Sequence, residues 1–134
     1  MSVAMTNCGA AGWVTDRTGY RYDRLDPESG WSWTSLPEGF FELAIGAAAE
    51  AGYSNFVPDA CLINRYEPDA RMTLHQDKNE RDYTFPIVSV LLSLPAIFQF
   101  VGLKRTDPPR KYAVRHGDVA NAGADLPGFA TMKC

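Results

Sequence analysis

The segment Ala60-Cys61-Leu62-Ile63-Asn64-Arg65-Tyr66 begins the part of the chain that decides the fold. Its branched and aromatic residues predict a β-strand, because it lies between Pro58 and the turn-forming Glu67-Pro68-Asp69-Ala70. Strand composition returns at three longer runs, Ile87 to Leu94, Ala96 to Phe100 and Lys111 to Arg115, and at a short return strand, Met72 to Leu74. Many short strands with few helices are typical of a sheet sandwich or jelly roll.

Upstream of this segment the pattern predicts one helix. Ser35 can cap its start, Pro37 follows early in the first turn, and an apolar stripe of Phe, Leu and Ala runs up to Gly52. We therefore predict a helix over residues 35–52 with Ser35 as the capping residue. Because several stripe residues are alanines, the helix suits packing against the outside of a sheet.

The first 34 residues predict strands and an exposed loop. Residues 2–6 and 20–22 alternate polar and apolar side chains, which indicates two short strands around a glycine-containing loop. Residues 26–30 form a turn or exposed loop, and we expect the aromatic rings of Trp31 and Trp33 to pack at a surface edge.

Length and composition fit one globular domain. The chain has 134 residues, of which 46% are hydrophobic and 22% charged, so disorder, collagen and coiled coil are poor interpretations. No apolar run approaches the roughly 20 residues that cross a bilayer.

Thirteen basic against sixteen acidic residues argue against a protein that coats nucleic acid by net charge. Three distant cysteines predict free thiols in a reducing compartment, and the start of the chain has no signal-peptide pattern, so we expect a cytoplasmic protein.

The polar group with the most chemical interest is His75-Gln76-Asp77. An imidazole and a carboxylate two residues apart in an extended segment point the same way, so both can reach one metal ion, as in the two-His, one-carboxylate site of non-haem Fe(II) oxygenases. By spacing alone a solvated loop remains an alternative. His116-Gly117-Asp118 has the same spacing, but Gly-Asp favours a turn between strands there.

Several ordered motifs together carry a resemblance. The strand at residues 59–66, then Leu74 to Asp77, Pro86 to Val90 and Pro95 to Phe100 resemble the AlkB family of DNA-alkylation repair dioxygenases. Residues 1–9 with Gly12-Trp13, Tyr20 and Tyr22 resemble the nucleotide-recognition lid of that family. The similarity extends from Met1 to about Val119. It implies an α+β fold: an incomplete double-stranded β-helix, or jelly roll, with an N-terminal β-hairpin lid and one main flanking helix.

The resemblance also implies the chemistry. Such enzymes use Fe(II), O2 and 2-oxoglutarate to hydroxylate the N-methyl group of a damaged base, which releases formaldehyde and leaves succinate. By position, His75 and Asp77 would be Fe(II) ligands, and Asn64, Arg65 and Tyr66 would form the 2-oxoglutarate site. Asn64 and Tyr66 are two apart on one predicted strand, so both could donate hydrogen bonds to a dicarboxylate from one face, while Arg65 points to the other. A polar strand face in water is the alternative for the pair.

The resemblance further implies a nucleic-acid substrate. Trp13 and Tyr20 would hold the flipped base, with Arg21 and Tyr22 close by, because an aromatic face replaces lost base stacking. Asn79 stands where the family usually has an acid that contacts the base, and Arg105 is another substrate-contacting position. Ordinary hairpin packing and a solvated basic loop are the alternatives. The expected partner is alkylated single-stranded DNA, with double-stranded DNA or RNA as alternatives, no membrane, and a monomeric state if the chain is complete.

The chain departs from the family pattern after Val119. The family continues with a tryptophan-containing strand, a distal His ligand and two Arg, whereas here no His follows His116 and no Arg follows Arg115. We interpret residues 1–119 as a partial dioxygenase domain, with a lid at 1–34, the helix at 35–52 and jelly-roll strands at 58–119. Residues 120–134 would be a divergent tail that makes a poor core strand, which truncation or a changed reading frame would explain.

These departures leave alternatives for the activity. We expect this chain alone to be weakly active or inactive, and we consider His116 a poor substitute for the distal ligand. Two other functions remain open: a non-catalytic fragment that binds single-stranded nucleic acid, and a related oxygenase acting on RNA or protein.

Overall fold

The computed structural model describes residues 3–73, 84–102, 104–122 and 129–133. The chain divides into two compact units. The N-terminal unit is Ala4–Arg65, and the C-terminal unit is Tyr66–Cys134 together with Met1–Val3. Strands dominate both, and the described part contains one helix, α1, which is too short to span a membrane.

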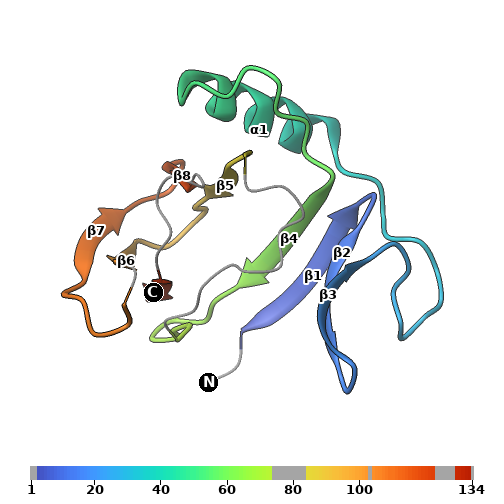
Figure 1. The fold of residues 1–134 in the computed structure, drawn as a ribbon, viewed down its shortest axis with the longest axis horizontal. Helices are drawn as coiled ribbons and strands as arrows, with labels where there is room; N and C mark the ends of the chain where they lie inside the picture. Colours follow the sequence, from blue (N-terminus) through green and yellow to red (C-terminus); the bar gives the residue numbers. More distant parts are fainter. Residues whose placement is uncertain (1–2, 74–83, 103, 123–128, 134) are drawn as a thin grey trace. The chain divides into compact units, whose positions relative to one another are not determined.

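Two antiparallel strands far apart in sequence form the first sheet of the N-terminal unit (Figure 1). Strand β1 (Ala4–Gly9) pairs with β4 (Ala60–Arg65), in a register that runs from Ala4 opposite Arg65 to Gly9 opposite Ala60. The predicted strand at residues 60–66 is confirmed, except that it ends at Arg65. The sheet therefore joins the predicted lid segment to the strand expected to carry the co-substrate residues.

The second sheet of this unit is a hairpin. Strand β2 (Gly12–Asp16) pairs with β3 (Gly19–Asp23), with Trp13 opposite Tyr22 and Thr15 opposite Tyr20. At the turn the Asp16 carboxylate accepts a hydrogen bond from the Thr18 N–H (2.8 Å), and Gly19 has a φ of 114°. An Asp two residues before the amide it binds, followed by Gly, is established turn chemistry. The sequence predicted β1 and β3 only in part and missed β2.

Helix α1 (Glu38–Glu50) is shorter at its start than predicted. Its capping residue is Pro37, with no side-chain capping bond, so the prediction of Ser35 as cap is wrong. The helix ends at Glu50, two residues before the predicted end, and Gly52 closes it as predicted: Gly52 has a φ of 95° and its N–H donates to Ala49 O, while the Tyr53 N–H donates to Ala48 O. This is the Schellman arrangement, in which Gly accepts the left-handed conformation without steric cost.

Little of the α1 apolar stripe is buried. Ala48 is fully buried, whereas Phe40 and Leu43 are more than 40% exposed. Phe41 and Ile45 are half-buried, so the stripe is covered only in part, and its packing against a sheet stays a prediction. Cys8 and Val14 are the buried apolar side chains of the strands in this unit.

The C-terminal unit has two small sheets. Strand β5 (Ile87–Val90) pairs antiparallel with β8 (Val119–Ala122). Strand β6 (Ala96–Val101) lies between β7 (Arg110–Val114) and β9 (Phe129–Lys133), both antiparallel to it. Ala70, Pro86, Ala96 and Val101 are its buried apolar residues among those described.

Three strand predictions need correction in this unit. Met72 and Thr73 lie outside any strand, and β5 ends at Val90 because the chain turns before Pro95, with Ser93 at a φ of 79°. Residues after Val119, predicted to be poor in strand structure, also pair: β8 extends to Ala122 beside β5, and β9 pairs with the central strand β6, while the divergence of this tail from the family pattern stays a prediction. Pairing with a neighbouring strand overrides the low strand propensity of Ala and Asn.

Candidate functional site

Three aromatic side chains share one face of the β2–β3 hairpin. Because side chains alternate along a strand, Trp13, Tyr20 and Tyr22 lie on the same side. The rings of Trp13 and Tyr20 are stacked with centroids 5.9 Å apart and planes inclined by 17°, and Tyr22 meets Trp13 edge-on at 5.3 Å. Tyr20 is 68% exposed. This face can offer an aromatic surface to a planar ring.

Asn7 fixes the backbone of Trp13. Its Nδ2 donates to the Trp13 carbonyl and its Oδ1 accepts from the Trp13 N–H, both at 2.9 Å. One amide side chain of β1 thus satisfies both polar groups of a β2 residue. The sequence prediction missed Asn7, because no local pattern shows which backbone an amide will reach.

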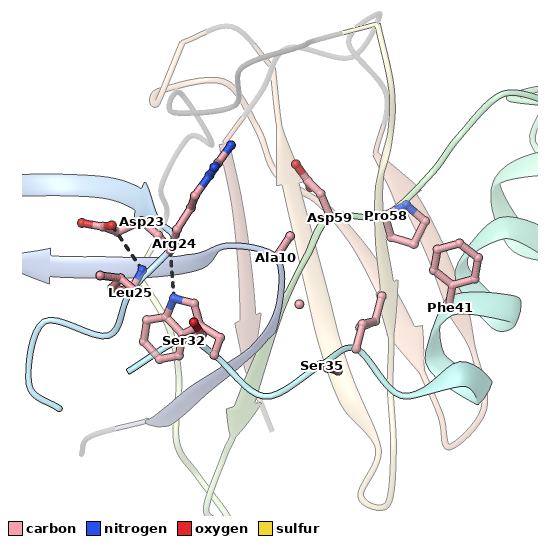
Figure 2. Close-up of a pocket in the computed structure, with 12 residues that line it drawn as sticks. Ala10, Asp23, Arg24, Leu25, Ser32, Ser35, Phe41, Pro58 and Asp59 are labelled. Carbon is pink, nitrogen blue, oxygen red and sulfur yellow. Dashed lines mark hydrogen bonds between the residues drawn. The ribbon is translucent and has the colours of Figure 1, made fainter. Parts of the chain in front are cut away.

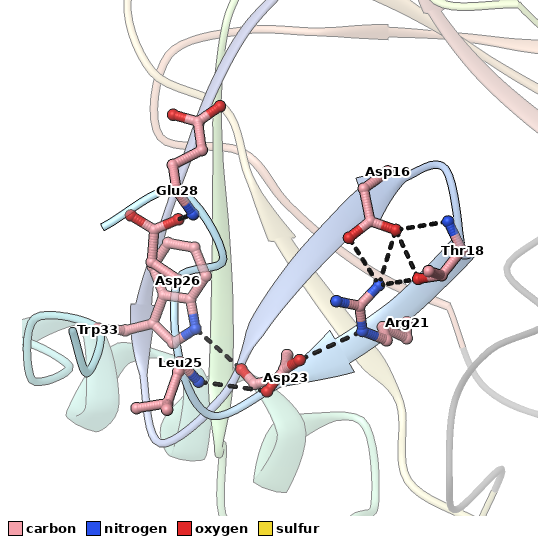
Figure 3. Close-up of polar contacts among 8 residues, drawn as sticks. All are labelled: Asp16, Thr18, Arg21, Asp23, Leu25, Asp26, Glu28 and Trp33. Carbon is pink, nitrogen blue, oxygen red and sulfur yellow. Dashed lines mark hydrogen bonds and ion pairs between the residues drawn. The ribbon is translucent and has the colours of Figure 1, made fainter. Parts of the chain in front are cut away.

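The opposite face of the hairpin is ionic (Figure 3). The guanidinium of Arg21 lies 3.0 Å from an Asp16 oxygen and 3.2 Å from an Asp23 oxygen, and it donates to Thr18 Oγ1 at 2.8 Å. Hydrogen bonds from Thr18 and then the Arg21 contact lower the pKa of Asp16 below its ordinary value. Of the four hairpin residues predicted to contact substrate, the structure brings three together and places Arg21 on the other side, held by carboxylates.

An open pocket of about 870 Å³ lies elsewhere in the N-terminal unit (Figure 2). Trp33 is at its wall, and the indole N–H donates to Asp23 O at 2.8 Å. The predicted packing at a surface edge is confirmed for Trp33, which is half-buried, whereas Trp31 is 77% exposed. None of the predicted site residues lines this pocket, whose lining consists of Gly9, Ala10, Asp23, Arg24, Leu25, Ser32, Trp33, Ser35, Leu36, Phe41, Pro58 and Asp59.

Asn64 carries a buried polar atom that lacks a hydrogen-bond partner, as expected of a ligand-binding residue. Its Oδ1 is buried and has no hydrogen-bond partner in the structure, and such an atom carries a free-energy cost. The oxygen and nitrogen of an amide exchange places by rotation, so the same position can hold an N–H donor. A carboxylate, which only accepts hydrogen bonds, would satisfy that donor. Asn64 therefore fits a dicarboxylate such as 2-oxoglutarate.

The other two predicted co-substrate residues are placed differently. Arg65 is exposed and, by strand alternation, points to the face opposite Asn64, as predicted. Tyr66 follows the last residue of β4 and belongs to the C-terminal unit, where its hydroxyl donates to Met72 Sδ at 4.0 Å. Tyr66 is thus outside the strand that was expected to hold it beside Asn64.

The predicted metal ligands His75 and Asp77, and the predicted base contact Asn79, lie outside the described residues. Within the residues that are described, no group of three or more His, Cys, Asp and Glu could hold a metal ion. The predicted roles of His75, Asp77 and Asn79 stay predictions.

The second histidine motif is a turn, as predicted. His116 is exposed and its Nδ1 accepts the Ser93 N–H at 2.8 Å, while Asp118 Oδ2 accepts the Arg115 N–H at 2.7 Å. Gly117 has a φ of 86° and donates to Leu91 O. The imidazole therefore binds the backbone of the β5–β6 connection, and the carboxylate binds the backbone of the β7–β8 connection.

Five basic residues, Arg105 among them, lie on the β6–β7 connection, on β7 and just after it. Asp107 shapes the connection by accepting the Lys104 N–H at 3.0 Å. Arg105 lies in this connection, and Arg110 and Lys111 begin β7 next to Tyr112, which is 51% exposed. All five basic side chains are exposed: Lys104, Arg105, Arg110, Lys111 and Arg115. This surface can contact phosphates.

Comparisons with known proteins identify the family to which this chain belongs. Residues 1–125 match the family described as the 2OG-Fe(II) oxygenase superfamily. The chain is 56% identical over 125 residues to "Alpha-ketoglutarate-dependent dioxygenase AlkB" of Escherichia coli (strain K12), which covers 93% of this chain and 58% of that protein. It is 31% identical over 108 residues to "Nucleic acid dioxygenase ALKBH1" of Homo sapiens, covering 80% of this chain and 27% of that one.

A solved structure is similar to this chain as well. "The structure of OsALKBH1" matches with a TM-score of 0.79 and 25% identity over 99% of this chain and 66% of that one. The likeness confirms the predicted fold class, an incomplete jelly roll of strands with one helix. The chain spans a little over half the length of the bacterial relative that it matches.

Proposed function

Because the chain belongs to the 2OG-Fe(II) oxygenase superfamily, and within it to the AlkB family, we propose that the protein oxidises the N-alkyl group of a damaged base in DNA. Per turnover, O2 and 2-oxoglutarate become succinate and CO2, and one oxygen atom enters the N-methyl carbon. The hydroxymethyl product then loses formaldehyde, which restores the base. The family requires Fe(II), 2-oxoglutarate and O2 for this chemistry.

The observation that carries the proposal is the aromatic face of the β2–β3 hairpin. Trp13 and Tyr20 form a stacked pair whose outer ring is mostly exposed, and Asn7 holds the backbone beneath it. A base that leaves its helical stack loses stacking energy, and an aromatic platform returns part of it. The geometry supports recognition of a base by its ring face.

We assign the remaining roles as follows. Asn64 would donate to a carboxylate of 2-oxoglutarate from its buried amide, which supports the co-substrate role. Tyr66 would assist from its hydroxyl, and Arg65 would act from the other face of β4. His75 and Asp77 would be ligands of Fe(II), which supplies the oxidising power when it is bound. Asn79 would contact the base with donors as well as an acceptor, so the preferred lesion could differ from that of relatives with an acid there.

For the form of the nucleic acid, we propose single-stranded DNA as the substrate, with RNA as the competitor to be tested. Stacking on Tyr20 needs an accessible base face, which a single strand offers without the cost of opening a duplex. The exposed cations around Arg105 would contact phosphates, and such contacts do not distinguish sequences. The relative named a nucleic acid dioxygenase agrees with this substrate class in general.

The direct test is formaldehyde release from N-methylated single-stranded DNA, with Fe(II) and 2-oxoglutarate supplied, in parallel with methylated RNA and peptide. Because no His follows His116 and no Arg follows Arg115 among the 134 residues, we expect this polypeptide to release formaldehyde only weakly. Robust turnover would contradict the expected defect. Binding separates recognition from turnover: fluorescence anisotropy should show tighter binding of a methylated than of an unmethylated strand.

A second candidate is a non-catalytic module that binds single strands. The exposed Tyr112 beside Arg110 and Lys111 favours it, because aromatic rings between cations are typical of single-strand binding. Such a module would bind with strong salt dependence and without metal dependence. If chelation of Fe(II) leaves both affinity and the preference for methylated strands unchanged, the binding module is favoured over the oxygenase.

A further inference from the structure

Cys8 and Cys61 lie directly opposite each other in the β1–β4 sheet. Their Cα atoms are register partners, so two residues 53 positions apart in sequence become cross-strand neighbours on one face. Both are free thiols in the structure. Neither the function proposed above nor the family comparison assigns them a role.

The hydrogen-bond pattern of the sheet sets their spacing. The Gly9 N–H donates to Thr34 O, away from β4, whereas the Ala10 N–H donates to Asp59 O. Hydrogen-bonded and non-hydrogen-bonded pairs alternate along an antiparallel ladder, so Cys8 and Cys61 occupy a hydrogen-bonded pair with Cα atoms about 5.5 Å apart. This falls within the range of about 4.4 to 6.8 Å that a disulfide spans.

The two cysteine side chains differ in their exposure to solvent. The side chain of Cys8 is 5% exposed, whereas that of Cys61 is half-buried. Burial, together with the charge and the hydrogen bond of the neighbouring Cys8 thiol, raises the pKa of Cys61 to about 11. The Cα register places the two side chains beside each other on one face of the sheet, so the thiols can meet without a change of strand register.

We propose that Cys8 and Cys61 form a cross-strand oxidation site that a hydroperoxide converts into a disulfide. The more accessible Cys61 attacks the terminal oxygen of the hydroperoxide, the O–O bond breaks, and a sulfenic acid and an alcohol or water result. The Cys8 sulfur then attacks the Cys61 sulfur, the S–O bond breaks, and water leaves with the second thiol proton. Two thiols lose two electrons in total, and the hydroperoxide gains them.

Oxidation at this site would act on the two strands that carry recognition residues. β1 holds Asn7, which binds the Trp13 backbone, and β4 holds Asn64 on the face opposite Cys61. A bond between Cys8 and Cys61 fixes the register of both strands. It also closes a long loop, which restricts the unfolded chain and should raise the melting temperature by several degrees.

The test uses the whole chain with Cys134→Ser, so that the third cysteine cannot compete. After treatment with hydrogen peroxide, peptide mass mapping should find one crosslinked species that joins the peptides of Cys8 and Cys61 and has lost two hydrogen masses. The rate should increase about tenfold per pH unit below the Cys61 pKa, because the thiolate is the nucleophile. A reductant should reverse both the crosslink and the rise in melting temperature.

Matched variants identify the order of the steps. Cys8→Ala should stop at the sulfenic acid on Cys61, which a dimedone probe labels, whereas Cys61→Ala should show little oxidation of the buried Cys8. Cys61 that oxidises to sulfinic acid with Cys8 present and no crosslinked peptide would overturn the proposal. So would a crosslink that forms only between two chains. The readout is independent of iron, co-substrate and nucleic acid, so it does not depend on the proposed function.

Discussion

The ten strand residues of the β2–β3 hairpin divide between two faces that differ in chemistry. One face carries the stacked rings of Trp13 and Tyr20 with Tyr22 at their edge, and Tyr20 stays largely in water. The other carries Arg21 between Asp16 and Asp23, with Thr18 closing the turn. The charged groups of the ionic face bind one another, whereas the ring of Tyr20 on the aromatic face stays mostly exposed to solvent.

The difference separates a recognition surface from a device that shapes the turn. Exposed ion pairs contribute little to stability individually, but several bonds converging on Asp16 fix the local conformation. Aromatic surface that stays in contact with water is unfavourable in free energy unless a binding partner covers it. Because alternate residues of one strand serve the two faces, single substitutions can test them independently.

The largest effect should come from the aromatic face. Trp13→Ala removes the ring that stacks on Tyr20, and base–aromatic stacking is worth about 1–3 kcal/mol per base, so affinity for a methylated single strand should fall about 5- to 150-fold. Anisotropy titration measures it. Trp13→Phe should retain part of the affinity, and Arg21→Gln, on the other face, should change it much less. Equal losses for Trp13→Ala and Arg21→Gln would contradict the division between the faces.

A second test concerns the support beneath the hairpin. A Cβ at Gly12 would overlap the Trp33 indole, whose N–H binds Asp23 O, so Gly12→Ala should destabilise the fold by about 1–3 kcal/mol. Urea unfolding followed by tryptophan fluorescence measures this. Gly46→Ala is the matched control, since nothing lies within 4 Å of its added Cβ in α1, and it should stabilise by about 0.5–1 kcal/mol. Equal changes in the free energy of unfolding for the two variants would show that the Trp33 side chain shifts without cost to accommodate the added Cβ.

Much of the fold could be predicted from local patterns. The strand at Ala60–Arg65 followed from its branched residues, and the closing of α1 by Gly52 followed from a glycine that accepts a positive φ. The predicted start of α1 was wrong because the helix begins at Glu38, with Pro37 and not Ser35 as its capping residue. Strands β8 and β9 were missed because pairing with β5 and β6, not their own composition, specifies them.

The site was only partly predictable for a related reason. The aromatic cluster of Trp13, Tyr20 and Tyr22 could be identified from a resemblance, but the face taken by Arg21 depends on the register of β2 and β3. Likewise, Asn7 and the opposition of Cys8 to Cys61 depend on cross-strand register, which no single segment encodes.

A smaller effect is expected at the link between β1 and the aromatic face. Asn7→Ala removes both 2.9 Å hydrogen bonds to the Trp13 backbone and leaves partly buried polar groups unsatisfied, which should cost about 1–2 kcal/mol. Asn7→Asp keeps the acceptor for the Trp13 N–H but loses the donor, so its loss of stability should lie between those of the wild type and Asn7→Ala. Amide hydrogen exchange at Trp13 should accelerate in the order wild type, Asn7→Asp, Asn7→Ala. Unchanged exchange in Asn7→Ala would mean that β2 is positioned without β1.

The smallest effect is a loosening of the ionic face in acid. Hydrogen bonds from Thr18 and then the Arg21 contact lower the pKa of Asp16, so the folded turn favours the carboxylate. The contribution is therefore fully present above the ordinary value of 3.8 and is lost as pH falls through the lower folded pKa. Amide protection at Thr18 should decline below that value, while the Trp13–Tyr20 contacts seen by NMR persist. Asp16→Asn should remove the pH dependence because its amide oxygen still accepts from Thr18 without titrating. Simultaneous loss of both faces in acid would show that the ionic turn, and not the strands, holds the aromatic rings in place.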